Sequence, residues 1–168
     1  MTEATSYRTS FNDTDWSLLV GLPQSVVWAA SAVEPDSAHR SMLESEAGLR
    51  AIAEGRESGS PLVEAVAAEV LNRVAGDPDL GEEPAVVVTP PDPQVFVDDC
   101  LTHARQVVAL LAGRVDEGDA GAYRHWLVAI ANEVVEAAPS GGVLGFGGQQ
   151  VTVAEQDFVH RLNIALGD

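Results

Sequence analysis

The chain has 168 residues, of which 46% are hydrophobic and 5% are aromatic. This length and hydrophobic content fit one domain with a sizeable core, and they exclude compositional disorder. The 26 acidic residues outnumber the nine basic residues, all of them Arg, and give a net charge of −17 at pH 7. Such a surface repels nucleic acid and anionic membranes, whereas it suits a cation or a basic partner.

The low aromatic content favours a core of Ala, Val and Leu in close-packed helices over a strand-rich fold. The hydrophobic pattern predicts an all-α, single-domain bundle of about six helices with antiparallel neighbours. We expect residues 1–12 to form a polar N-terminal tail and residues 13–168 to form the helical domain. No apolar run approaches the ~20 residues that cross a bilayer, and the N-terminus lacks a signal-peptide layout. The sequence therefore predicts a cytoplasmic protein.

A first helix opens at Asp13, is interrupted by Gly21 and Pro23, and restarts with Pro23 in its first turn. Residues 26–33 are apolar nearly all round, which is typical of a helix in the middle of a bundle. The next helix repeats apolar or small residues at four- and three-residue steps, which predicts one buried face and an end at Gly55. The residues of this face are Ala38, Met42, Ser45, Leu49 and Ile52.

Ser60 and Pro61 begin the following helix, as an N-cap and a proline in the first turn. This helix stops at Gly76 and carries an exposed pair of Glu69 and Arg73. Its predicted buried residues are Val63, Val66, Val70 and Val74.

Residues 76–93 are rich in Pro and predict a long irregular connection. Helices then follow over about 93–113 and 119–138, and a Gly-rich loop over 139–151 leads to the last helix. That helix opens with a capping box in which Thr152 and Glu155 serve each other's backbone amides. The predicted buried residues are Val97, Leu101, Ala104, Val108 and Leu111, then Tyr123, Leu127, Ile130 and Val134, and finally Ala154, Phe158, Leu162 and Ala165.

The Gly-rich loop is the most distinctive segment of the chain. Its glycines could expose amides to a phosphate near a helix start, but no Lys-Ser/Thr pair follows them and no strand precedes them. The interleaved apolar side chains instead predict a hydrophobic plug or an exposed contact surface for a partner. The residues of this hypothetical binding loop are Gly142, Val143, Leu144, Gly145, Phe146 and Gly147.

A metal site is the second hypothesis, because the chain is so acidic. It would need inward carboxylates from different helices, and Glu34, Asp36, Asp99 and Glu133 are the candidate ligands. The sequence has neither Glu-x-x-His nor His-Glu-x-x-His, so solvated helix faces explain the His and acid spacings better. The single cysteine, Cys100, excludes a disulfide and a Cys-rich zinc site, and its apolar pattern favours a core residue over a nucleophile.

Enzymatic patterns are lacking in the sequence. There is no Gly-x-Ser-x-Gly elbow, and the three Trp residues at 16, 28 and 126 are best interpreted as core. A small-molecule binder or an enzyme would need a cleft near His125, near Trp126 or at the Gly-rich loop.

Two motifs carry a family resemblance. The opening Phe11-Asn-Asp-Thr-Asp-Trp16, with Val33-Glu34-Pro35, resembles the start of a family of uncharacterised all-helical bacterial proteins. Residues 141–148, followed by Val151-Thr-Val-Ala-Glu155, resemble that family's close. More remotely, the layout is similar to helical domains associated with tellurite resistance, where an Asp-Gly segment after an early helix is linked to cation binding. This chain has Glu34-Pro35-Asp36 there, without the glycine. The resemblance implies the helical fold and no activity.

We therefore expect a non-enzymatic interaction or scaffold protein of the bacterial cytoplasm, without a cofactor, that binds a protein partner or itself. The alternatives are a stress-response protein that binds a divalent cation, and a small-molecule binder or enzyme with a pocket between helices.

Overall fold

The computed structural model describes residues 3–34, 38–76, 92–137 and 151–167. Over these ranges it contains seven α-helices, one 3-10 turn and no strand, so the predicted all-α bundle is confirmed. The Gly142–Gly147 loop and Asp36 lie outside the described residues. The helices are α1 (Glu3–Ser10), α2 (Asp13–Ala32), α3 (Ala38–Glu54), α4 (Pro61–Ala75), α5 (Pro93–Leu111), α6 (Glu117–Glu136) and α7 (Val153–Leu166), with the 3-10 turn η1 (Gly55–Glu57) after α3.

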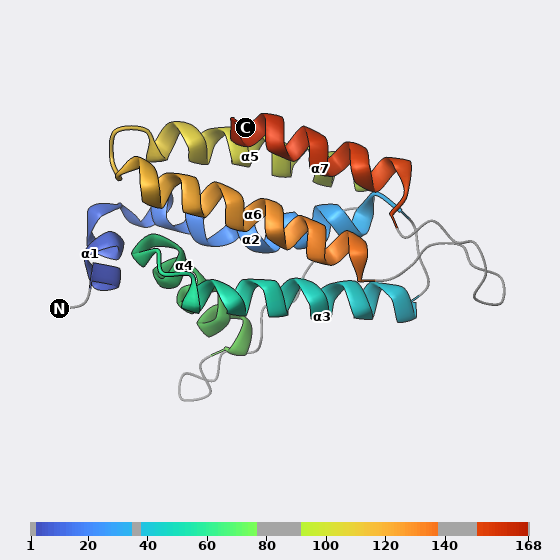
Figure 1. Ribbon diagram of the computed structural model, residues 1–168, viewed down its shortest axis with the longest axis horizontal. Helices are drawn as coiled ribbons and strands as arrows, with labels where there is room; N and C mark the ends of the chain where they lie inside the picture. Colours follow the sequence, from blue (N-terminus) through green and yellow to red (C-terminus); the bar gives the residue numbers. More distant parts are fainter. Residues whose placement is uncertain (1–2, 35–37, 77–91, 138–150, 168) are drawn as a thin grey trace.

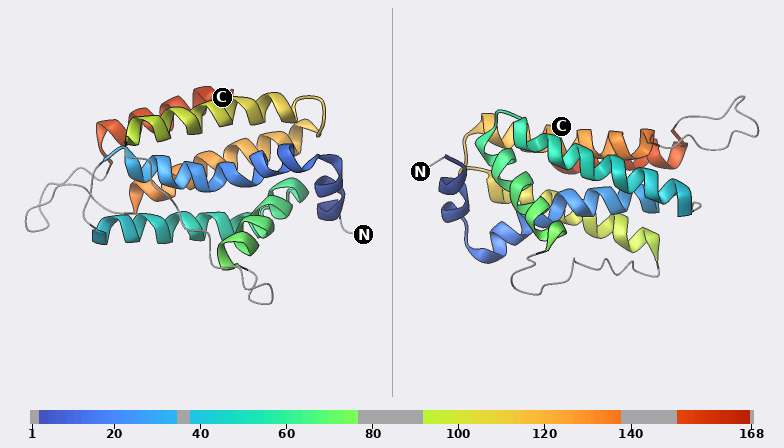
Figure 2. Two further views of the ribbon diagram at one scale, coloured as in Figure 1. Left: turned by 180° about the vertical axis from the view of Figure 1, so that it is seen from behind. Right: turned by 90° about the horizontal axis from the view of Figure 1, so that it is seen from below.

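The helices form three layers, with α2 and α6 between the α5–α7 pair and the α3–α4 pair (Figures 1 and 2). Figure 1 shows α2 and α6 running in one direction and α3, α5 and α7 running in the other. Helix α2 contacts each of the helices α3 to α7. The expectation that residues 26–33 are central is confirmed, because Val26, Val27, Ala29 and Ala30 are buried.

Helix starts follow the predicted capping chemistry. Ser60 Oγ accepts the backbone N–H of Val63, and Pro61 occupies the first helical position, where its missing N–H costs nothing. Thr152 and Glu155 form the expected capping box at the start of α7. The Glu69–Arg73 pair is also present, with Arg73 Nε 3.0 Å from Glu69 Oε1.

The interruption predicted at Gly21 and Pro23 is wrong, because α2 runs through both residues. Pro23 has no N–H, so the Leu19 carbonyl four residues earlier loses its helical donor. The hydroxyl of Tyr123 on α6 supplies the replacement and donates to Leu19 O at 2.7 Å. Burial raises the pKa of Tyr123, which keeps the hydroxyl protonated as a donor. A contact from another helix therefore replaces the hydrogen bond that the proline removes.

The predicted polar tail contains helix α1 instead. Phe11, which follows α1, is buried in the core, and the Tyr7 hydroxyl donates to Asp116 Oδ2 at 3.3 Å and to Asp119. These acids stand at the start of α6. The N-terminal segment is thus held by contacts with distant residues, which a short polar sequence does not reveal.

The predicted buried face of α3 is also wrong for three of its residues. Met42 is 60% exposed, and Ser45 and Leu49 are exposed as well. The side that packs inward instead carries two glycines. A Cβ atom at Gly48 would lie 2.6 Å from the Val27 side chain, and one at Gly55 would lie 2.7 Å from the Trp126 ring. The residues that make this side are Arg40, Glu44, Ala47, Gly48, Ala51, Ile52 and Gly55. Because small residues let α3 approach closely, its inward side carries little apolar side-chain bulk and the periodicity rule missed it.

The Leu19–Tyr123 hydrogen bond gives the first testable prediction. Tyr123→Phe keeps the ring but leaves the Leu19 carbonyl without this donor, and we expect unfolding free energy to fall by about 1–3 kcal/mol. In a Pro23→Ala background the helical N–H returns, so the same substitution should cost clearly less. Urea unfolding of the four proteins measures this coupling. An equal cost of Tyr123→Phe in both backgrounds would show that Pro23 is not what the hydroxyl compensates.

Candidate functional site

Helix α7 lies between two surface grooves. The α5–α7 groove has a volume of about 340 Å³ and includes Val33, Asp92, Val97, Phe158 and Arg161. It also includes Ala32, Pro93, Gln94, Ala154 and Asp157. The α6–α7 groove has a volume of about 380 Å³ and includes Asn132, Glu136, Val151, Gln156, Val159, His160 and Asn163. Sequence reasoning predicted neither groove, because each depends on how two helices lie side by side.

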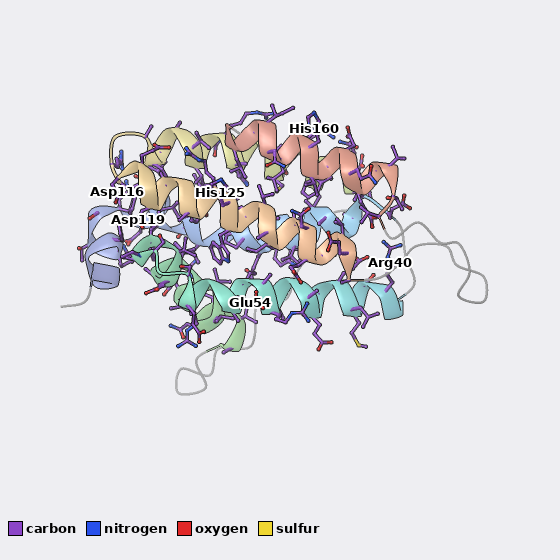
Figure 3. The ribbon with its side chains drawn as sticks, viewed as in Figure 1. Arg40, Glu54, Asp116, Asp119, His125 and His160 are labelled. Atoms are coloured by element: carbon purple, nitrogen blue, oxygen red, sulfur yellow. The ribbon has the colours of Figure 1, made fainter. Side chains whose placement is uncertain are left out.

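The outer face of α7 consists of Val153, Asp157, His160 and Ile164. Their spacing of four, three and four residues places them on one helix side, directed away from the buried Phe158 and Leu162. Val153 is 74% exposed and Ile164 is 59% exposed. Figure 3 shows His160 on the side of α7 that is remote from α2. Large apolar side chains therefore mark both ends of a ridge between the two grooves.

Acidic groups outnumber basic ones around this ridge. Arg161 is the one Arg among the residues that line the two grooves, whereas Asp92, Asp157 and Glu136 are all present there. Arg161 Nη2 lies 2.9 Å from Asp98 Oδ1, and Nη1 lies 4.0 Å from Asp157 Oδ2. The stronger ion pair of Arg161 is therefore with α5, and the surroundings of α7 keep a net negative charge.

A buried ionic network holds the start of α7. Arg40 Nε donates to Glu44 Oε1 at 2.8 Å, and Arg40 Nη2 donates to Glu155 Oε1. The other Glu155 oxygen accepts the Thr152 N–H at 2.6 Å. Arg40, Glu44 and Glu155 are 8%, 2% and 1% exposed. One carboxylate thus caps α7 and also binds the guanidinium of α3.

This network overturns one expectation about α7. We predicted Ala154 as a buried residue, but Ala154 is exposed and Glu155 takes the inward position. The Arg40 charge and a backbone N–H bind the Glu155 carboxylate and offset the free-energy cost of burying it. The only sequence signal was the capping box, which does not say whether its Glu is solvated.

At the opposite end of the bundle, the acidic side chains cap a helix and accept hydrogen bonds from other helices. Figure 3 shows Asp116 and Asp119 there, far from Arg40. Asp116 caps α6 by accepting the Asp119 N–H at 3.0 Å, and this hydrogen bond lowers the pKa of the Asp116 carboxyl. Asp119 accepts hydrogen bonds from Tyr7 and from Ser60. These acids serve helix starts and contacts between helices, which is a structural role.

The predicted metal ligands are not brought together by the described part of the chain. Glu133 Oε2 lies 3.0 Å from Arg50 Nη2, Asp99 is exposed on α5, and Asp36 lies outside the described residues. Within residues 3–34, 38–76, 92–137 and 151–167, no group of three or more His, Cys, Asp or Glu could hold a metal ion. The metal hypothesis, which includes Glu34, stays a prediction.

The three Trp residues and the cysteine belong to the core or pack against it. Trp126 is buried and its indole N–H donates to Ala51 O at 3.1 Å, while Trp16 is buried and Trp28 packs against the core. His125 is exposed, and neither His125 nor Trp126 lines either groove. Cys100 is buried, and burial raises the pKa of its thiol to about 12.

No protein-family model, no curated protein and no solved structure matches this chain. The family resemblance of the two end motifs stays a prediction. Among the helices that the structure describes, none is long and apolar enough to cross a membrane.

Cys100 should react only when the protein opens. At about pH 8 a free thiol is partly ionised, but a group with a pKa of about 12 is not. We expect alkylation by iodoacetamide to be slow in the folded protein and to accelerate in urea along the unfolding curve followed by circular dichroism. Rapid labelling of the folded protein would instead indicate an accessible thiolate.

The buried network predicts that one single substitution lowers the unfolding free energy more than a double substitution that includes it. Arg40→Met removes the guanidinium that two buried carboxylates contact and should cost about 3–5 kcal/mol of unfolding free energy. Adding Glu44→Leu removes one of those charges, so the double variant should be more stable than the single one. The control is Arg50→Met, which breaks the exposed pair with Glu133 and should cost less than about 1 kcal/mol. A double variant less stable than Arg40→Met would contradict this account.

Proposed function

We propose that this chain is a non-enzymatic interaction protein of the bacterial cytoplasm that binds a protein partner through the outer face of α7. The observation that supports this most directly is the exposure of Val153 and Ile164 on one ridge, with a groove on each side. Exposed apolar side chains that stand next to concave surface offer a partner both buried area and shape.

The α3 surface is the competing candidate. Met42 and Leu49 are exposed there and lie seven residues apart on one helix side. However, no α3 residue lines either groove. The two grooves therefore flank α7, and their concave surface adds to the apolar side chains there, so α7 is favoured.

Charge selects the class of partner. Two copies of this chain would bring charges of −17 together, which opposes self-association. Nucleic acid is disfavoured for the same reason. A protein segment with apolar residues on one side and Lys or Arg on its flanks fits both the ridge and the surrounding carboxylates. We therefore favour a basic amphipathic helix as the ligand of α7.

A defined peptide tests the proposal. An amphipathic Leu/Lys helix, labelled for fluorescence anisotropy, should bind the protein, and Val153→Ala with Ile164→Ala should weaken binding about tenfold or more because apolar area is lost. The control is Met42→Ala with Leu49→Ala, which removes comparable exposed apolar groups from α3 and should leave the affinity unchanged.

Two outcomes would reject the proposal. Equal binding by the α7 double variant and the wild type would mean that the peptide follows net charge alone. A loss of affinity confined to the α3 double variant would move the interaction surface to α3. Circular dichroism of all variants confirms that the bundle is intact.

A further inference from the structure

We propose that the α5–α7 groove is the anchor site for a Lys or Arg side chain of the partner, with an apolar floor for the stem and two carboxylates for the cation. This inference rests on the proposed function, because it assigns one part of the ligand that the α7 face would bind. Three properties of the groove support it: its floor, its charge and its size.

The floor of the groove is part of the hydrophobic core. Val97 and Phe158 are almost fully buried, and Val33 packs against the same core. These three residues come from α5, α7 and the end of α2, which meet at this place. Above this floor, half-buried Val33 and exposed Pro93 and Ala154 present the apolar surface that the aliphatic stem of Lys or Arg can cover, while its charged head stays at the rim.

The rim carries the charge that a cation needs. Asp92 and Asp157 line the groove and are exposed, and the nearby Arg161 is paired at 2.9 Å with Asp98 and lies 4.0 Å from Asp157. Three carboxylates and one guanidinium sum to a charge of −2. The starts of α5 and α7 oppose this with about +0.5 each, and the end of α2 adds about −0.5, so the total stays negative at about −1.5. An anion is therefore disfavoured although two helix starts converge here.

The size of the groove fits one side chain. Its volume of about 340 Å³ lies at the lower end of the range for small-molecule sites. A helix, about 10 Å wide, is too large for it, whereas one long side chain projecting from a helix on the α7 ridge can enter. The α6–α7 groove suits this role less well, because it offers one carboxylate, from Glu136, and amide groups from Asn132, Gln156 and Asn163.

The test uses Asp92→Asn with Asp157→Asn and the same Leu/Lys peptide. Asn at position 92 keeps the capping of α5, where Asp92 Oδ1 accepts the Gln94 N–H at 2.9 Å. The double variant should weaken peptide binding about tenfold. The matched control is Asp13→Asn with Asp99→Asn, which removes the same charge from exposed acids outside the groove and should have a smaller effect. Peptide binding should also shift the methyl NMR signals of Val33 and Val97.

The outcomes separate the two proposals. If Val153→Ala with Ile164→Ala weakens binding while the groove variant behaves like its control, the anchor site is rejected and the α7 interface stands. If neither pair of substitutions weakens binding, both are rejected. Butylguanidinium serves as the probe for a free small cation. If it binds as tightly as the peptide and shifts the same methyl signals, the groove is a small-molecule site, which overturns the assignment to a partner side chain.

Discussion

The hydrogen bond from Tyr123 to the Leu19 carbonyl is the contact on which the central layer of the bundle depends. Helix α2 contacts each of α3 to α7, and it can do so only because it continues through Pro23. A proline in a buried helix leaves a carbonyl that water cannot reach, and that carbonyl must find a donor elsewhere. Helix α6 supplies the donor at 2.7 Å. The two helices of the middle layer are therefore joined by a specific polar contact as well as by apolar packing.

Helix α3 depends on a different constraint, because its backbone lies very close to side chains of α2 and α6. Gly48 and Gly55 leave no room for a Cβ atom against Val27 of α2 and Trp126 of α6. Trp126 adds to this contact by donating its indole N–H to Ala51 O in the last turn of α3. Farther along the same helix, Arg40 forms the buried network with Glu44 and Glu155. Helix α3 thus contacts the middle layer through small residues and contacts α7 through charge.

The sequence predicted the elements whose burial follows a regular apolar pattern. Helix α6 is the clearest case, because Tyr123, Leu127, Ile130 and Val134 are all buried as expected. The failures share one cause, which is a residue whose role depends on a partner from another helix. Pro23 needed Tyr123, and the pattern of one helix contains no information about its neighbours.

The candidate site shows the same limit. The capping box at the start of α7 was readable from the sequence, whereas the burial of Glu155 beside Arg40 was not. The two grooves beside α7 depend on side-by-side packing and left no signal in the order of residues. The Gly142–Gly147 loop, the most distinctive segment of the sequence, lies outside the described residues, so the site proposed from the structure rests on other side chains.

The acids of this bundle differ in how far the fold itself uses their charge. At the Asp116 end, carboxylates accept backbone N–H groups at a helix start and receive hydrogen bonds from Tyr7 and Ser60. Such acids lower the free energy of the folded state, since they meet the positive end of a helix dipole. Along α7, by contrast, Asp157 has only a 4.0 Å contact with Arg161, whose closer partner is Asp98. Within the described part of the chain, the Asp157 carboxylate forms no closer ion pair than this one, and it stays exposed beside the apolar floor of the groove. Asp157 is therefore the groove carboxylate that the fold uses least, whereas Asp92 lines the same groove and also caps α5.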